Sequence, residues 1–195
     1  LASLDPSAEQ PSGGAALTPL VLPLPPPAAP HRRPPAADDR MQWITSIPYL
    51  GMHVASLSAF WLGATFWDVA LCIGLYYFRM FGITAGYHRY FSHHSFKTSR
   101  AAQFLFGVLG ASAVQRGPIW WAAHHRHHHA FSDKPNDVHS PRQQGFWWSH
   151  MGWFLSGKHF APDLKRVKDL MEYPELRFLD RFDIFVPVML AVAIF

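Results

Sequence analysis

Two apolar segments in the first half of the chain predict a pair of membrane-spanning helices. Residues 41–67 contain no charged side chain, and residues 43–63 supply the length, about 20 residues at about 1.5 Å each, that a helix needs to cross a bilayer. A second apolar run over residues 69–87 is interrupted only by Arg79. A turn between the two runs would join them, so the pattern predicts a helical hairpin over residues 43–87.

Basic residues indicate on which side of the membrane this hairpin opens. They flank it at both ends: Arg32, Arg33, Arg40, Arg89, Lys97 and Arg100. The turn carries only Asp68. Because cytosolic loops are enriched in Lys and Arg, both ends of the hairpin are expected in the cytosol, together with most of residues 88–183.

The rest of the pattern predicts three further segments. Residues 101–114 are uncharged but too short to span a bilayer, so a buried or in-plane helix is expected there. Residues 158–183 are mixed and charged, which indicates a solvated helix. Residues 184–195 resemble a third span that stops after about half of its needed length. Since the chain also opens on Leu1 and not on Met, the sequence predicts a fragment of a longer protein.

The N-terminal segment has a different composition. Residues 1–40 hold most of the prolines, with alanine, serine and glycine between them and no apolar periodicity. Such a segment buries too little apolar surface to offset the entropy of ordering, so a disordered, partly polyproline tail is expected. A targeting peptide is the alternative, but the segment lacks the positive, apolar and small-residue regions in order. A single domain over residues 41–195 is expected to follow.

Composition narrows the class of protein. Charged residues make up 15% of the chain, against about a quarter in a typical soluble domain. The formal net charge of +4 is modest and gives no reason to expect a nucleic-acid partner. The single cysteine, Cys72, excludes an internal disulfide. Thirteen histidines are the outlying number, and most of them fall between His88 and His150.

The second of two histidine clusters, which follows a pair of tryptophans, has the spacing of a helical face. In a helix, positions i, i+3 and i+4 lie on the same side, so His125, His128 and His129 are expected to converge. His127 then points elsewhere. Neither it nor His124 is expected to bind a metal.

The first cluster, His88 and His93, lies at the end of the second apolar run. Five positions separate the two residues, and a regular helix would splay their side chains. They can join one site only if the helix ends or bends between them, or if they serve different metal ions.

The chemistry of these clusters is that of a metal site. Nothing structural requires five clustered histidines, whereas neutral imidazole is a good ligand for iron, zinc, copper or nickel. A loose metal-binding tract is the alternative for the run over residues 127–129. The set has no cysteine and few carboxylates, which argues against typical structural zinc and calcium sites. Oxygen-activating iron stays open, and a membrane setting suggests an apolar, chemically inert substrate.

Three segments resemble one family of enzymes. GITAGYHRYFSH (residues 82–93), WWAAHHRHHHAFSD (residues 120–133) and HSPRQQGFWWSHMGW (residues 139–153) are similar to the membrane fatty-acyl desaturases of the stearoyl-CoA desaturase type. In that family the first histidine box is HxxxxH and the second is HxxHH. The boxes match five residues here: His88, His93, His125, His128 and His129. The resemblance implies that these histidines bind a di-iron centre.

The resemblance also implies a fold, a reaction and partners. The fold is an all-α, polytopic membrane helical bundle whose cytosolic helical cap holds the two iron ions. Dioxygen and two electrons introduce a cis double bond into a saturated acyl chain, carried as acyl-CoA or acyl-lipid. The electrons come from a b-type cytochrome or a ferredoxin-like donor. The membrane is the bacterial inner membrane or the endoplasmic reticulum, with the histidine boxes facing the cytosol.

Further residues in the three segments are expected to support the centre. The candidates to orient the imidazoles or the cap are Arg89, Arg126, Asp133 and Asp137. The candidates for outer support or for contact with the substrate are His139 and His150. Relatives usually have Asp-Pro-His where this chain has Asp137-Val138-His139. The family's third histidine box has no counterpart before Phe195, so the chain by itself is expected to be inactive.

Two alternatives stay open. A related membrane di-iron hydroxylase would insert oxygen into the acyl chain instead of removing hydrogen. A non-catalytic metal-binding protein derived from the same fold would keep the histidines without the reaction. The presence of new double bonds or new hydroxyl groups in cellular lipids discriminates the two enzymes.

Overall fold

The computed structural model describes residues 40–194, which form an all-helical protein. The expected all-α class is confirmed: the described residues hold helices, one isolated bridge between Met41 and Ser156, and no strand. The expected proline-rich tail lies, except for Arg40, outside the described residues.

Fourteen helices, several of them a single turn, make up this part of the chain. In order they are α1 (Trp43–Ser56), α2 (Ala59–Leu62), α3 (Phe66–Phe81), the π-helix η2 (Gly82–Ser92), α4 (Arg100–Ala111), α5 (Pro118–Phe131), α6 (Pro141–Gln144), the π-helix η3 (Trp148–Gly152), α7 (Trp153–Leu155), the 3₁₀-helices η4 (Gly157–His159) and η5 (Leu164–Val167), α8 (Lys168–Met171), α9 (Pro174–Arg181) and α10 (Phe185–Ile194).

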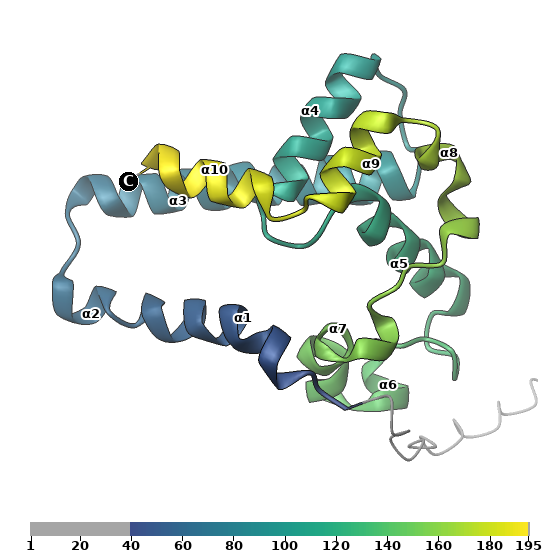
Figure 1. The fold of residues 1–195 in the computed structure, drawn as a ribbon, viewed down its shortest axis with the longest axis horizontal. Coiled ribbons are helices and arrows are strands. Elements are labelled where there is room, and N and C mark those ends of the chain that lie inside the picture. Colours follow the sequence, from purple (N-terminus) through teal and green to yellow (C-terminus); the bar gives the residue numbers. More distant parts are fainter. Residues whose placement is uncertain (1–39, 195) are drawn as a thin grey trace, which may run out of the picture.

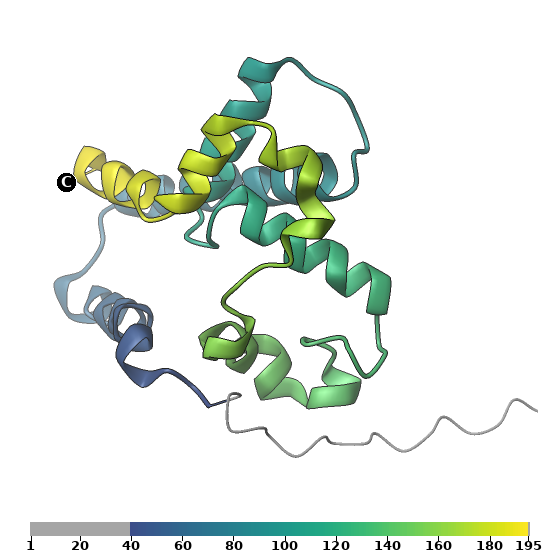
Figure 2. The ribbon, with the colours of Figure 1, turned by 45° about the vertical axis from the view of Figure 1, so that its right-hand side comes forward.

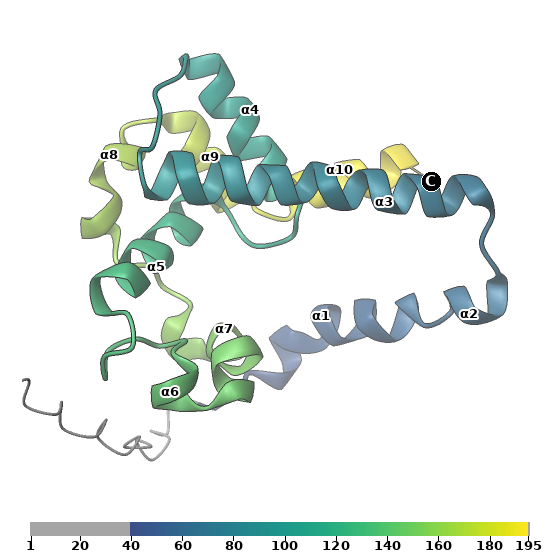
Figure 3. The same cartoon turned by 180° about the vertical axis from the view of Figure 1, so that it is seen from behind.

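Two helical arms project from a compact group of shorter helices (Figure 1). One arm is α1 followed by α2, and the other is α3 continued by η2; a short connection joins them at the far end (Figure 3). Within residues 40–194, Phe66–Ser92 is the one helix long and apolar enough to cross a membrane. The two arms over residues 43–87 fold back on each other as a hairpin, but only the second has the length of the predicted span.

The first arm is not the continuous helix that a span over residues 43–63 requires. It breaks after Ser56, because Ser58 turns its hydroxyl back onto the carbonyl of Ala55 at 2.7 Å. The backbone N–H of Ser58 donates to the same carbonyl at 3.0 Å, in a tight i to i+3 turn. Serine side chains that bond nearby carbonyls compete with helical hydrogen bonds, so the first apolar run becomes two shorter helices.

The second arm begins at a capping box. The Thr65 hydroxyl accepts a hydrogen bond from the backbone N–H of Asp68, and the Asp68 carboxylate accepts one from the backbone N–H of Thr65 at 2.8 Å. These reciprocal bonds satisfy the N–H groups that the first turn of a helix leaves unpaired. Asp68, in the first turn of α3, thus has a local structural role.

Helix η2 packs closely on α4 through glycines. A side chain at Gly82 would lie 2.8 Å from the backbone of Leu109, and one at Gly110 would overlap the ring of Tyr87. Tyr87 is fully buried and donates its hydroxyl to the carbonyl of Arg116 at 3.0 Å. The close approach that glycine permits therefore fixes the second arm against the rest of the fold.

Helix α5 lies at the centre of the shorter helices. Its buried face contributes to a core made of Tyr87, Phe91, Ile119, Ala122, Ala123, Val167, Leu170 and Leu176. The start of α5 is capped from α9, because the carboxylate of Asp180 accepts the backbone N–H of Trp120 at 2.8 Å. Figure 2 shows that α5 links the group formed by α4, α8 and α9 to the group formed by α6 and α7.

The charged C-terminal region differs from its prediction. Residues 158–183 do not form one solvated helix; η5, α8 and α9 follow η4 as separate short helices. Pro174 opens α9, since proline is favoured at the first helical position and disfavours helix in the residue before it. Leu176 and Leu179 are buried, so this region covers the core. The helix expected within residues 101–114 is present as α4, and α10 occupies residues 185–194.

Candidate metal centre

The first pair of histidines, His88 and His93, is brought together by the π-helix η2. In a π-helix the backbone N–H of residue i+5 donates to the carbonyl of residue i, and the N–H of His93 donates to His88 in this way at 3.1 Å. The five-residue spacing that splays side chains in an α-helix here aligns them. Their Nε2 atoms lie 3.1 Å apart. These two residues are called the η2 pair below.

The second pair lies on α5, one turn apart. His125 and His129 occupy positions i and i+4, so they share a helical face, and their Nε2 atoms lie 3.0 Å apart. The Trp121 ring stacks on His125 with 4.6 Å between ring centroids and supports that imidazole from the preceding turn. These two histidines are called the α5 pair.

The two pairs face each other and form a single four-histidine cluster. One ligand nitrogen from each ring lies within 4.8 Å of the others. Across the pairs, ring centroids are 4.7 Å apart for His88 and His125 and 4.5 Å apart for His93 and His129. His88 and His125 are half-buried and the other two rings are exposed, so the cluster opens on one side.

The surroundings of three of these imidazoles disfavour protonation. Burial, followed by the neighbouring histidines, lowers the pKa of His125 to about 3. Burial and the adjacent imidazoles also lower the pKa values of His93 and His129. A metal ion binds the neutral form of imidazole, so the lowered pKa values of His93, His125 and His129 favour the form that a metal ligand requires.

The spacing of the nitrogens fits a small transition-metal ion. An imidazole nitrogen lies about 2.1 Å from an ion such as zinc, so two such nitrogens at a right angle are about 3.0 Å apart. The separations within the η2 pair and the α5 pair are 3.1 Å and 3.0 Å. The geometry therefore suits coordination by both pairs.

The fifth predicted ligand, His128, turns toward a different group. Its Nδ1 lies 3.0 Å from the carboxylate of Asp137, and its ring is 4.2 Å from that of His139. Asp137 is fully buried and also accepts the backbone N–H groups of Asp133 and His139 at 3.0 and 3.3 Å. His128, Asp137 and His139 are called the aspartate cluster. The expected convergence of His128 with the α5 pair is therefore only partial.

The remaining predicted residues lie in varied surroundings. Arg89 and His150 are exposed, and the ring of His150 stacks on Phe146. Asp133 accepts the hydroxyl of Ser140 at 2.6 Å and shapes the loop around the aspartate cluster. Arg126 contacts the end of η2, as described in the last subsection of the Results.

The two histidines not expected to bind a metal lie outside both clusters. The Nε2 of His127 lies 2.9 Å from the backbone carbonyl of Asn136. His124 packs between Trp120 and Trp153, and burial lowers its pKa to about 4. The placement of His124 and His127 agrees with the expectation that neither binds a metal. That expectation stays a prediction.

Sequence reasoning missed three residues that shape the site. His94 and Asp169 contact Arg126, and Asp180 caps the helix that carries the α5 pair. His94 was visible as the second histidine of a doublet. Asp169 and Asp180 stand in a run of mixed charge, which gives no signal for a tertiary contact more than 40 residues away.

The fold and the site define an all-helical protein whose clustered imidazoles fit a metal centre. When the chain is compared with protein families, the model of the fatty acid desaturase family matches residues 59–195. The chain belongs to the fatty acid desaturase family.

Individual relatives are desaturases from cyanobacteria and plants. An sn-1 stearoyl-lipid 9-desaturase of Anabaena variabilis is 35% identical over 156 residues, covering 78% of this chain and 57% of that protein. An acyl-CoA 5-desaturase of Anemone leveillei is 37% identical over 146 residues, covering 69% and 43%. A chloroplastic palmitoyl-monogalactosyldiacylglycerol delta-7 desaturase of Arabidopsis thaliana is 39% identical over 150 residues, covering 75% and 40%. The chain spans about half the length of the curated relatives it matches.

Proposed function

We propose that this chain carries the metal-binding part of an oxygen-dependent fatty-acyl desaturase, which introduces a cis double bond into a saturated acyl chain. The observation that carries the proposal is the four-histidine cluster, in which η2 and α5 present four imidazoles whose ligand nitrogens lie within 4.8 Å of one another. Family membership adds the reaction class, because the similar proteins are named as desaturases of acyl lipids or acyl-CoA.

The η2 pair, the α5 pair and His128 are the residues that would hold two iron ions. When bound, iron supplies with dioxygen and two electrons the oxidising power to remove two hydrogens from adjacent methylenes, which have no acidic proton. The protein's part is to hold the ligands, orient the acyl chain and limit the access of water. His128 would coordinate through Nε2, because its Nδ1 already faces Asp137.

The proposed surroundings are those of an integral membrane enzyme. Phe66–Ser92 has the length and apolar character of a span, and large apolar side chains on both arms are exposed, including Trp61, Phe66 and Trp67. Such surface is compatible with lipid and costly in water. The two arms then form a membrane hairpin with the histidines on the cytosolic side, in the bacterial inner membrane or the endoplasmic reticulum.

Cysteine labelling tests this topology. In a Cys72→Ser background, Ala64→Cys reports the connection between the arms and Lys134→Cys reports the helices around the histidines. An impermeant thiol reagent should label the two positions from opposite faces of the membrane. Labelling of both from the same face would contradict the topology.

The proposed substrate is an acyl-CoA or an acyl-lipid, and the electron donor is a b-type cytochrome or a ferredoxin-like carrier. The reaction is tested by gas chromatography and mass spectrometry of lipids from cells that express the full-length gene. New cis-unsaturated chains should appear with the native protein and be absent with His125→Ala. Hydroxylated chains in their place would identify a hydroxylase. Unchanged lipids despite an iron-loaded, membrane-inserted protein would overturn the proposal.

A further inference from the structure

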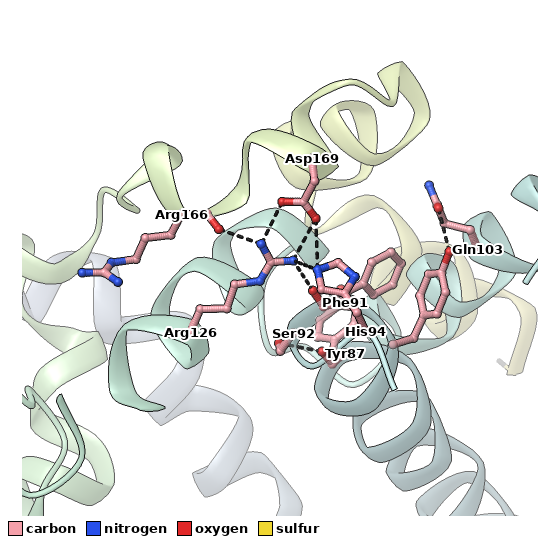
Figure 4. A network of polar contacts seen from close by, with 9 residues as sticks. Tyr87, Phe91, Ser92, His94, Gln103, Arg126, Arg166 and Asp169 are labelled. Carbon is pink, nitrogen blue, oxygen red and sulfur yellow. Dashed lines mark hydrogen bonds and ion pairs between the residues drawn. The ribbon is translucent and has the colours of Figure 1, made fainter. Parts of the chain in front are cut away.

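Arg126 stands among the histidines of α5 but makes contacts of a different kind. Its sequence neighbours are His125 and His127, yet its guanidinium reaches the end of η2 and the segment before α8 (Figure 4). The side chain is only 17% exposed. A buried guanidinium needs several partners to offset its loss of hydration; here both terminal nitrogens have them, while Nε has no hydrogen-bond partner among the described residues.

The contacts of Arg126 join three segments of the chain. Nη2 donates to the carbonyl of Phe91 at 2.6 Å, in the last turn of η2. Nη1 donates to the carbonyl of Arg166 at 2.6 Å. Both terminal nitrogens bond the two oxygens of Asp169, at 2.8 and 2.9 Å. The arginine of α5 is thereby tied to η2 on one side and to η5 and α8 on the other.

The end of η2 is the part of the cluster that most needs such support. The last carbonyls of a helix have no partner inside that helix, and Arg126 supplies one for Phe91, two residues before His93. Beyond His93 the chain turns through His94, whose φ of 50° is in the left-handed region that costs energy for a residue with a side chain. The ring of His94 also lies 2.8 Å from Nη2 of Arg126.

We propose that Arg126 is a positioning residue that fixes the η2 pair relative to the α5 pair; this inference rests on the proposed function. The geometry calls for arginine in particular. A planar guanidinium presents its N–H groups in a fixed fork, which can bond a carboxylate with two nitrogens and reach carbonyls on either side. The ammonium of lysine is a single point of charge and cannot satisfy the Phe91 carbonyl, the Arg166 carbonyl and Asp169 together.

Cobalt(II) binding tests the role without relying on turnover. The chain is purified in detergent, freed of metal and titrated with cobalt, whose visible absorption reports both affinity and ligand geometry. Arg126→Gln and Arg126→Lys should each weaken binding roughly 10- to 100-fold, the range found when a residue supporting a ligand is lost, and should alter the spectrum. Their helix content by circular dichroism should match that of the native chain.

A matched control uses a second arginine that bonds a carboxylate with two nitrogens, Arg100. Arg100 bonds both carboxylate oxygens of Glu175 at 2.7 and 2.8 Å but is 64% exposed. Arg100→Gln should leave cobalt affinity and spectrum unchanged, because an exposed pair contributes little and this one does not contact η2 near the histidines.

The two variants distinguish a positioning role of Arg126 from a role in the stability of the fold. If Arg126→Gln does not fold, Arg126→Lys alone decides. Native-like cobalt binding by Arg126→Lys overturns the positioning role, and so does a loss of binding that is matched by an equal loss of helix, since Arg126 would then serve the fold at large. If the native chain itself binds no cobalt, the metal centre of the proposed function fails, which is distinguishable from failure of Arg126 alone.

Discussion

The four-histidine cluster and the aspartate cluster share helix α5 but differ in what surrounds their imidazoles. In the four-histidine cluster the two Nε2 atoms of each pair face each other, at 3.1 Å in the η2 pair and 3.0 Å in the α5 pair. In the aspartate cluster a fully buried carboxylate receives the ring of His128 and two backbone N–H groups. Both clusters bring their potential ligand atoms within 4.8 Å of one another, but only the aspartate cluster contains a carboxylate.

The winding of α5 explains how one helix contributes histidines to both clusters. Consecutive positions on α5 are about 100° apart, because there are 3.6 residues per turn, so His128 and His129 face different neighbours. A carboxylate on the far nitrogen of a ligand fixes the orientation of the ring and makes the other nitrogen more basic. Under the proposed function, Asp137 would in this way prepare the Nε2 of His128 for metal.

The largest effect is expected from removal of a ring in the four-histidine cluster. His125→Ala removes a half-buried imidazole that faces His88, His93 and His129. Iron binding and desaturation by the full-length gene product should be abolished. Metal analysis of the purified protein and lipid chromatography measure both. Retention of native iron content by His125→Ala would show that the cluster is not the ligand set.

A smaller but clear effect is expected at the centre of the aspartate cluster. In Asp137→Asn the amide NH₂ would face donors, because His128 Nδ1 and two backbone N–H groups all point at this carboxylate. Metal affinity should fall roughly 10- to 100-fold. Isothermal titration with cobalt measures the loss, and Glu172→Gln, at an exposed position outside both clusters, is the control. Equal affinities for Asp137→Asn and the native chain would remove the orienting role.

The next effect concerns the second ring of the aspartate cluster. His139→Ala removes an imidazole that packs on His128 and on Trp153, at 4.2 and 5.4 Å between centroids. The bond between His128 and Asp137 does not depend on this ring, so cobalt affinity should fall less than in Asp137→Asn. His53→Ala, at an exposed position in α1 and outside both clusters, controls for the loss of a histidine elsewhere. Complete loss of binding in His139→Ala would instead make His139 a ligand.

The smallest effect is expected at His127, which shares α5 with both clusters. Its Nε2 lies 2.9 Å from the carbonyl of Asn136 and belongs to neither set of donor atoms. His127→Ala should retain native iron content and desaturation, apart from a slight loss of stability from the broken hydrogen bond. Iron analysis and melting temperature measure the two quantities. A defect equal to that of His125→Ala would contradict the separation of roles on α5.

Spacing alone predicted half of the four-histidine cluster. The i, i+4 relation of His125 and His129 requires only that α5 be a helix, which the sequence indicates. The η2 pair could not be placed in this way, because π-helical winding is rare and is held here by packing on α4 and by Arg126. The sequence allowed the helix to bend or end between His88 and His93. In the structure the helix continues through this segment with a different pitch.

The fold shows the same division between local and tertiary causes. The apolar run of α3 and the helical character of α4 follow from patterns within each segment. The break at Ser58, the division of residues 158–183 and the placement of His128 depend on individual hydrogen bonds and on contacts between distant segments. The periodicity of apolar residues does not report such single contacts. It therefore predicts the existence of a helix more reliably than the positions of its ends.

The central claim, that imidazoles from η2 and α5 together bind the metal, is tested most directly by X-ray absorption at the iron edge. Iron is added anaerobically to the purified chain, and the extended fine structure reports the ligand atoms. The account predicts a shell of nitrogen and oxygen with the multiple-scattering pattern of several imidazoles, which is reduced in His93→Ala and again in the double variant with His129→Ala. A spectrum without imidazole scattering, or one unchanged in both variants, would contradict it.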